Sequence, residues 1–383
     1  MGTMRERSPG TWELTVSTGW DPALGRYGRV IRTVRTSSRR EVKKALARLE
    51  VEVAGGQLGP SDPTVAQLLS RWMDHLERLG RSESTLYGYG NYINRELVPA
   101  IGDVRLSKLT ARHLDGLYTT LTQRGLAPAT VRQIHALVRA ALNQAVRWGL
   151  VGRNVALLAS APSQPQREQR PPTAAKVLAL IKAGTELDPM FGLYVRVVAA
   201  TGMRRSEACG LRWSDVDLRT GRLTVARSHL SLPGAVGDRP TKSRSARTVV
   251  LDEGTVEALR AGWRAARQLA RFAGVDDDTR RAGYVFSFDA DGAGAWRGDM
   301  VTARWERTRR AAGVTGVRLH DLRHWQATQL LDAGVPVPTV AARLGHADGT
   351  TTMKIYAHRT ERADEQAALV VGAALDSVVE GRR

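Results

Sequence analysis

The last quarter of the chain contains the stretch His320-Asp321-Leu322-Arg323-His324, which is followed by Leu344-Gly345-His346 and then by Tyr356. Polar residues dominate positions at which an ordinary core helix buries Leu or Val. His320 and Arg323 lie three residues apart, so on a helix they share one face. The stretch therefore predicts a reactive site rather than a piece of hydrophobic core.

A second arginine, Arg204, follows an apolar run in the segment Thr201-Gly202-Met203-Arg204-Arg205-Ser206-Glu207. Two guanidinium groups suit a phosphate, because each presents planar donors to the non-bridging oxygens. A tyrosine hydroxyl beside them is a potential nucleophile. Together, Arg204, Arg323 and Tyr356 predict a site that breaks a phosphodiester through a covalent tyrosyl intermediate.

Four segments resemble the signature boxes of the tyrosine recombinases, the phage-integrase family. They occur in the family's order, with matching spacing between the late boxes, and the resemblance covers residues 60–383. Trp325 departs from the family, in which a small hydroxyl residue commonly follows the second histidine, and we expect it to change local packing rather than the reaction. The four segments are Ala200-Thr201-Gly202-Met203-Arg204, His320-Asp321-Leu322-Arg323-His324, Leu344-Gly345-His346 and Ile355-Tyr356-Ala357-His358.

The resemblance implies a role for each residue that would face the phosphate. Arg204 and Arg323 would hold the non-bridging oxygens and offset the charge that grows on the phosphorus. His346 would donate a further hydrogen bond to the phosphate. Neither ATP nor a metal is expected, because the phosphotyrosine retains the ester.

The resemblance also implies how protons move. A tyrosine has an ordinary pKa near ~10, so the Tyr356 nucleophile needs a proton acceptor, and His320 would serve. Lys242 would protonate the departing 5′-oxygen. It lies in Thr241-Lys242-Ser243, in a connection between two expected strands, and matches the family's hairpin lysine best. A plain charged turn is the alternative for this loop.

Composition agrees with a nucleic-acid partner. The chain has 383 residues, with 57 Lys and Arg against 38 Asp and Glu, a net charge of +19. Such an excess is typical of proteins that bind a polyanion, although a solvated basic surface without a partner is an alternative. Apolar runs fall short of the ~20 residues of a membrane helix, and no secretory signal is visible. The single Cys209 fits a reducing compartment, so we expect a cytoplasmic, nucleoid-associated protein with no membrane partner.

The expected fold is multidomain. A small α/β arm-type DNA-binding domain would occupy residues 1–58, and an all-α core-binding bundle residues 61–162. A Pro- and Gln-rich linker over 163–172 would lead to a mixed α/β catalytic domain with a C-terminal helix over 173–383. At this length two or three domains are expected.

The arm-type domain is predicted from two strands, over 11–20 and 26–36, and a helix from 38 to about 53 that opens with a capping box. Residues 1–60 hold eleven basic and six acidic side chains. The basic strand is expected to place its side chains along one exposed edge or face. A small solubilising appendage is the alternative. The candidate DNA contacts are Arg29, Arg32, Arg35, Arg39, Arg40, Lys43 and Lys44.

The bundle is predicted from apolar residues at helical spacing after Thr64, and from further helices over 84–97, 110–124 and 129–148. Arg81, Arg132 and Arg139 are candidate phosphate contacts, with ordinary surface residues as the alternative.

In the catalytic domain, a helix near 189–200 and strands over 222–227 and 245–251 are expected. Glu207 is expected to orient an arginine, and Asp321 to start a helix. Two carboxylate clusters, at 215–217 and 276–278, are expected to be solvated turns rather than metal ligands. The apolar tail over 367–375 predicts a helix that docks either on its own domain or on a neighbouring copy.

The predicted function is site-specific recombination of double-stranded DNA attachment sites, by an integrase that inserts or excises a mobile element. Two duplexes cut by one tyrosine per strand imply a tetramer on DNA, formed from free monomers. A DNA-bending accessory protein or a directionality factor is a further expected partner. The alternatives are a type IB topoisomerase, a non-catalytic DNA-binding regulator with the same fold, and a metal-dependent transposase. The sequence offers no convincing carboxylate triad for the transposase.

Overall fold

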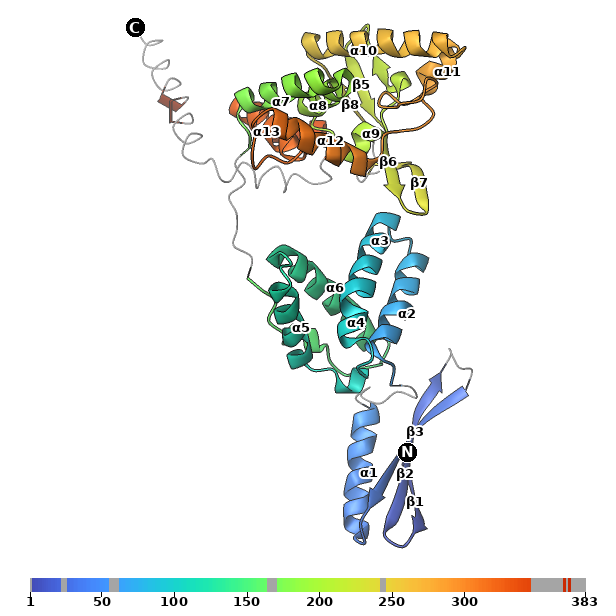
Figure 1. Ribbon diagram of the computed structural model, residues 1–383. Helices are drawn as coiled ribbons and strands as arrows, with labels where there is room; N and C mark the ends of the chain where they lie inside the picture. Colours follow the sequence, from blue (N-terminus) through green and yellow to red (C-terminus); the bar gives the residue numbers. More distant parts are fainter. Residues whose placement is uncertain are drawn as a thin grey trace, which may run out of the picture. The chain divides into compact units, whose positions relative to one another are not determined.

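The computed structural model divides the chain into two compact units, Met1–Arg167 and Glu168–Arg383 (Figure 1). The boundary falls within the predicted linker. No helix of the described residues is long and apolar enough to cross a membrane. The structure describes residues 2–21, 26–54, 62–163, 171–241, 246–345, 368–369 and 371–372.

The chain begins with a three-stranded antiparallel sheet in the order β1-β2-β3. Helix α1 (Arg39–Ala54) packs on one face, where Leu14 and Val16 of the sheet meet Val42 and Leu49 of the helix. Strand β1 was not predicted, because its sequence has a single large apolar residue, Met4, and therefore no alternating pattern. The strands are β1 (Gly2–Ser8), β2 (Thr11–Asp21) and β3 (Arg26–Arg35).

A helical bundle follows, and its predicted helices are confirmed to within a few residues. Thr64 caps the first helix, since its hydroxyl accepts from the Gln67 amide at 3.3 Å and its amide donates to the Gln67 side chain at 2.9 Å. A π-helical turn, Ile93–Leu97, joins α3 to α4. The helices are α2 (Val65–Arg78), α3 (Glu83–Tyr92), α4 (Val98–Ile101), α5 (Ala111–Gln123) and α6 (Pro128–Arg147).

The second unit is built around helix α8 (Pro189–Thr201), which is buried on nearly every side. Its sequence is almost continuously apolar, as expected for a helix surrounded by others. It contacts α7, α10 and α13. The helices of this unit are α7 (Ala174–Leu187), α8, α9 (Arg205–Cys209), α10 (Glu253–Phe272), α11 (Asp277–Ala282), α12 (Gly298–Ala311), α13 (Asp321–Asp332) and α14 (Val337–Leu344).

Two small sheets complete the second unit. One has the strand order β4-β5-β8 and the other is the hairpin β6-β7. The expected strand over 222–227 is divided at Ala226, and the hairpin that follows was not predicted, because Gly234 and Gly237 interrupt its apolar pattern. The strands are β4 (Val216–Asp217), β5 (Arg222–Val225), β6 (Arg227–Leu232), β7 (Ala235–Pro240) and β8 (Arg247–Val250).

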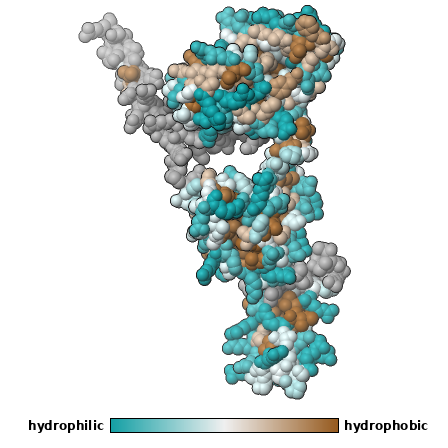
Figure 2. All heavy atoms as spheres, viewed as in Figure 1, coloured by the Kyte–Doolittle hydropathy of each residue, from teal (hydrophilic) through white to brown (hydrophobic). Residues whose placement is uncertain are grey.

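One expected carboxylate turn is in fact a helix start. Asp276 accepts hydrogen bonds from the amide and the hydroxyl of Thr279, at 2.8 and 2.7 Å, and so caps α11. The helix was missed because Asp-rich sequence is equally typical of a polar loop and of a first helical turn. On the face shown in Figure 2, hydrophilic and hydrophobic residues are interspersed over both units.

Candidate active site

Glycine 202 makes the turn that delivers Arg204. It ends α8 in the left-handed conformation, with φ +64°, where a Cβ is disfavoured. A Cβ on Gly202 would also lie 2.2 Å from Oε1 of Gln326 and 2.5 Å from a methyl of Leu344. The chain then buries Met203, and Arg204 becomes the residue that precedes α9. The box Thr-Gly-Met-Arg is therefore a close-packed helix-to-helix turn.

A buried carboxylate holds Arg204. Oε1 of Glu207 accepts from Nη1 of Arg204 at 2.7 Å, and Oε2 accepts from the Arg204 amide at 3.0 Å. Arg247 donates to Oε2 from the other side at 2.7 Å. Burial raises the pKa of this carboxyl, but the hydrogen bonds from Arg247 and Arg204 outweigh it and leave the pKa below its ordinary value. Glu207 is therefore ionised and, as predicted, orients an arginine.

Arg323 lies beside this pair, in the first turn of α13. Its side chain is buried, and Nη1 donates to the carbonyl of Gly202 at 2.6 Å. Nη2 has no hydrogen-bond partner among the described residues. Burial and the nearby charge of Arg204 lower the Arg323 pKa to about 9, so the group stays protonated at neutral pH. A protonated, unpaired donor of this kind suits an anionic oxygen.

His320 lies one residue before α13, which begins at Asp321 as predicted. With Met203 it lines a hollow of about 290 Å³, and its ring stands perpendicular to that of His324, 4.9 Å away. Although His320 is exposed at this rim, partial burial of the ring, with His324 and Arg323 near it, lowers its pKa to about 4. A neutral imidazole is the form that accepts a proton.

The structure thus brings together three of the six predicted catalytic residues: Arg204, His320 and Arg323. The other three, Lys242, His346 and Tyr356, lie outside the described residues, and their roles stay predictions. Two described neighbours bear on them. Thr241, which precedes Lys242, is buried, and the carbonyl of Gly345, which precedes His346, accepts from Nη2 of Arg204 at 3.3 Å.

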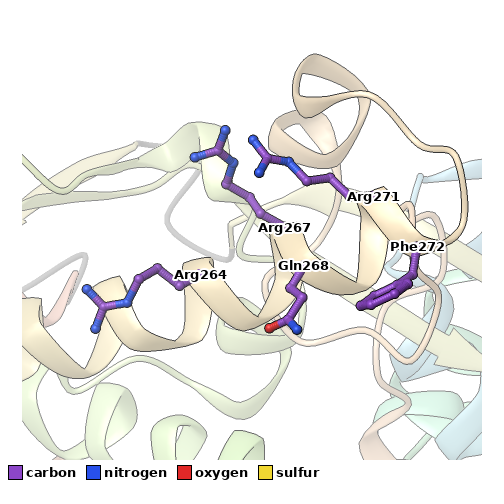
Figure 3. Close-up of a pocket in the computed structure, with 5 residues that line it drawn as sticks. All are labelled: Arg264, Arg267, Gln268, Arg271 and Phe272. Atoms are coloured by element: carbon purple, nitrogen blue, oxygen red, sulfur yellow. The ribbon is translucent and has the colours of Figure 1, made fainter.

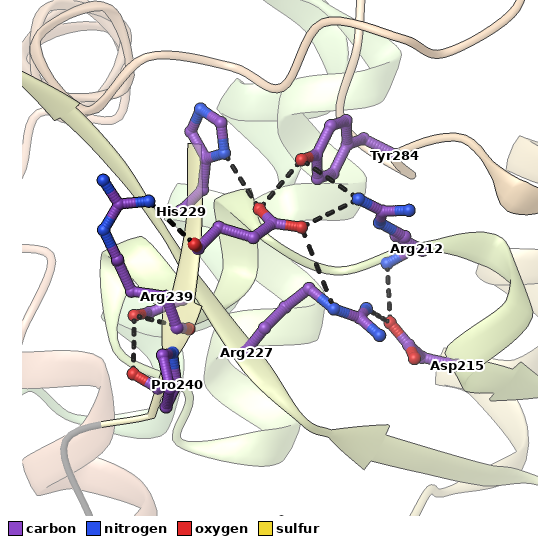
Figure 4. Close-up of polar contacts among 9 residues, drawn as sticks. Arg212, Asp215, Arg227, His229, Arg239, Pro240 and Tyr284 are labelled. Carbon is purple, nitrogen blue, oxygen red and sulfur yellow. Dashed lines mark hydrogen bonds and ion pairs between the residues drawn. The ribbon is translucent and has the colours of Figure 1, made fainter. Parts of the chain in front are cut away.

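A second polar network anchors the β6-β7 hairpin to the body of the unit (Figure 4). Asp238 of β7 accepts from the Tyr284 hydroxyl at 2.8 Å and from Nη2 of Arg212 at 2.8 Å. His229 of β6 contacts the same carboxylate at 3.1 Å. Arg227 forms an ion pair with Asp215. This carboxylate, which was expected in a solvated turn at 215–217, is therefore part of the network. The hairpin leading to Lys242 is therefore fixed at its base.

The role of Arg247 was not predicted from the sequence. A signal was present, because strand periodicity from the buried Val249 puts Arg247 on the same, inward face of β8. A charge on the buried face of an apolar strand indicates a partner, and here the partner is Glu207.

Cys209 is a structural residue rather than a reactive one. Burial raises the pKa of the Cys209 thiol to about 12, which makes it a poor nucleophile, as predicted. Among the described residues, no three His, Cys, Asp or Glu side chains gather as a metal site would require. A basic hollow of about 480 Å³ on α10 includes no residue of the signature boxes (Figure 3); Arg264, Arg267, Gln268, Arg271 and Phe272 line it.

In the N-terminal sheet, the candidate arginines of β3 point in two directions. Arg32 is paired in register with Leu14 and therefore points to the helix side, where it forms an ion pair of 2.9 Å with Glu52. Arg29 and Arg35 lie on the opposite face, because an odd spacing reverses the direction of a strand side chain. The three arginines do not share one face. Arg39, Arg40, Lys43 and Lys44 of α1 are exposed.

The bundle candidates are all at the surface. Arg81 follows α2, and Arg132 and Arg139 lie on α6, all three exposed. Arg132 also donates to the carbonyl of Pro162 at 3.2 Å, which ties α6 to the segment after it.

Gly202→Ala should destabilise the protein more than a matched change elsewhere. Gly313 has the same φ of +64° with nothing within 4 Å of a new Cβ, so Gly313→Ala carries only the left-handed penalty of roughly 1–2 kcal/mol. Gly202→Ala adds a clash with Gln326 and Leu344, worth a further ~1–3 kcal/mol. Urea midpoints of the two variants measure the difference, and equal midpoints would contradict the close packing described here.

His320 should titrate well below an ordinary histidine. Solvent screening at its exposed edge makes about 4 the lower limit, so the NMR midpoint should lie between about 4 and ~6.5. Because the folded pKa is depressed, the contribution of His320 to stability is complete above ~6.5 and declines as the pH falls toward about 4. His320→Gln assigns the resonance and should lack this decline. A midpoint above ~6.5 would contradict the neutral form.

Comparison with known proteins gives a consistent result. The phage integrase family matches residues 173–362, and the N-terminal SAM-like domain of phage integrases matches residues 64–121. A tyrosine recombinase XerC-like protein of Caldanaerobacter subterraneus subsp. tengcongensis is 24% identical over 319 residues, 78% of this chain and 80% of that protein. An integrase of Streptomyces ambofaciens is 27% identical over 377 residues, 94% of this chain and 92% of that protein.

The fold has a solved counterpart. The structure of the Tn1549 transposon integrase in complex with transposon right end DNA has a TM-score of 0.69 and 18% sequence identity. The match covers 81% of this chain and 99% of that one. At this identity the likeness concerns the fold.

Proposed function

The chain belongs to the tyrosine recombinase, or phage integrase, family, and on this premise we propose that it cleaves and rejoins DNA at specific sites through a 3′-phosphotyrosyl intermediate. The observation that carries the proposal is the convergence of Arg204 and Arg323 beside a neutral His320. The reaction would integrate or excise a mobile element.

In this mechanism the two arginines hold the scissile phosphate. Each guanidinium donates to a non-bridging oxygen and offsets the charge that develops as phosphorus becomes pentacoordinate. Nη2 of Arg323, which has no hydrogen-bond partner among the described residues, would be one of these donors. Glu207 keeps Arg204 in place, and His346 donates a further hydrogen bond.

The bonds and protons balance without an added cofactor. The Tyr356 oxygen attacks phosphorus, its proton passes to His320, and the bond from phosphorus to the 5′-oxygen breaks. Lys242 donates a proton to that oxygen, which leaves as a 5′-hydroxyl. Attack by the 5′-hydroxyl of a partner strand reverses these steps and joins new ends. The anchored β6-β7 hairpin supports the assignment of Lys242 to this site.

The reported relatives are a recombinase and an integrase, which favours strand exchange over the nicking and closing reaction of a type IB topoisomerase. Exchange between two duplexes cuts four strands, one per tyrosine, so the active species on DNA would be a tetramer of this chain. Its partners would be double-stranded attachment sites, with a DNA-bending accessory protein or directionality factor where flanking DNA is engaged.

Tyr356→Phe tests the proposal most directly. The change removes one hydroxyl, so DNA affinity should be retained while covalent adducts on a nicked suicide substrate disappear. Tyr87→Phe, in α3, is the matched control and should form adducts at the wild-type rate. Adduct formation is measured by gel electrophoresis in excess EDTA, because positioned arginines supply the positive charge that a metal gives in metal nucleases. Adducts that survive Tyr356→Phe, or that require added Mg²⁺, would contradict the mechanism.

We further propose three functional domains, each of which has a hydrophobic core of its own: residues 1–58 would bind arm-type DNA, 61–162 would clamp the core site and 173–383 would catalyse strand exchange. The open face of the N-terminal sheet, which carries Arg29 and Arg35, would meet the DNA. Helix α1 covers the other face.

Arm-type binding should depend on the face of the sheet rather than on charge alone. The double change Arg29→Ala/Arg35→Ala should weaken binding to flanked DNA and flatten its dependence on salt, by about one phosphate contact per arginine. Arg32→Ala, compared with either single change, removes the same charge from the helix side and should change the salt slope little. Cleavage of a short core site should be unaffected by either change. Equal effects of the two sets would contradict the assignment of the open face.

A further inference from the structure

Arg247 joins three parts of the site that are far apart in the sequence. Its Nη2 donates to Glu207 at 2.7 Å, and its Nε donates to the carbonyl of Arg343 at 2.9 Å. Its side chain is 8% exposed, so both contacts are shielded from solvent. Arg247 itself begins β8, five residues after Lys242.

The contact with Glu207 links Arg247 to Arg204, because both arginines donate to the same carboxylate. The two oxygens of this carboxylate are shared: Oε1 accepts from the Arg204 guanidinium, and Oε2 accepts from Arg247 and from the Arg204 amide. If Arg247 is removed, Glu207 loses one of its two charged partners and can rotate. The orientation of the Arg204 fork then changes with it.

The contact with Arg343 reaches the turn before His346. Helix α14 ends at Gly345, in the left-handed conformation with φ +66°. A Cβ on Gly345 would lie 2.9 Å from Nη1 of Arg247, so the guanidinium packs directly against this turn. The same turn presents the Gly345 carbonyl to Arg204.

We propose that Arg247 is a positioning residue for the scissile phosphate: through Glu207, and through the Gly345 turn whose carbonyl accepts from Arg204, it aims the Arg204 guanidinium. The inference rests on the proposed function. Arg247 has no direct part in bond breaking here. Its effect on the reaction is exerted through Arg204, and this gives it a signature that a purely structural residue lacks.

The experiment compares cleavage of two suicide substrates by the full chain, one with a normal scissile phosphate and one with a methylphosphonate. The methylphosphonate replaces a charged non-bridging oxygen with a methyl group, so there is less charge for Arg204 to offset. Arg247→Ala should slow adduct formation on the phosphate on the order of 10–10²-fold, as small misplacements of a positioned group do. On the methylphosphonate the loss should shrink, in parallel with Arg204→Ala.

A double-mutant cycle gives the second readout. Because both changes act through one guanidinium, the losses of Arg204→Ala and Arg247→Ala on the phosphate should not multiply in the double variant. Arg247→Lys covers the case in which the alanine variant does not fold. It keeps a charge beside Glu207 but cannot span Glu207 and the Arg343 carbonyl with one planar fork, so it should show the same substrate dependence.

The matched control is Arg280→Ala, which removes a buried arginine of the same unit whose contact is the Tyr284 carbonyl at 3.0 Å. Any loss that it causes should be equal on the two substrates. Two results would overturn the proposal: equal losses for the Arg247 variants on the two substrates, or losses that multiply fully in the double variant with Arg204→Ala. Neither result would touch the recombinase function as long as the wild-type protein forms adducts. Failure of the wild-type protein to form adducts would overturn that function and the inference with it.

Discussion

One buried carboxylate makes the rest of the site possible. Glu207 lies between Arg204 and Arg247, and Arg323 is near enough that both guanidiniums lower its pKa. Three such cations repel one another in a partly dehydrated region, and a single anion reduces the repulsion without removing it. On the proposed function, an incoming phosphate diester would neutralise the excess positive charge that remains. A second carboxylate in this place would stabilise the empty site and weaken its attraction for DNA.

The elements that carry these groups are held together by α8. This helix packs against α7, α10 and α13, and its C-terminal turn contacts residues of α13 and α14. Arginine side chains therefore emerge from a close-packed apolar body rather than from free loops. Preorganisation of this kind keeps charged groups from reorienting as the reaction proceeds. The Asp238 network fixes the β6-β7 hairpin through polar contacts, whereas α8 fixes the arginines through apolar packing.

Sequence patterns predicted α1, the long helices of the bundle and α8, because apolar spacing of 3.6 residues survives in a single sequence, but they did not predict α7, α10, α12 or α14. They also predicted the boxes that carry Arg204, His320 and Arg323, whose residue types are chemically distinctive. They failed where the determining interaction is non-local. Strand β1 exists because β2 offers it a partner, and the β6-β7 hairpin is fixed by Tyr284, some 46 residues from Asp238. The direction of Arg32 follows from register, which no local pattern specifies.

The state of Cys209 has a practical consequence. It is the sole cysteine of the 383 residues, it is 1% exposed, and its thiol is protonated at neutral pH because its pKa is about 12. Maleimide and similar reagents attack thiolates, so they will pass over it in the folded protein. Any cysteine introduced on a solvent-facing helix would then be the one that reacts. The natural chain is in this respect already a background for attaching a single fluorophore or spin label, with no preliminary substitution in its core.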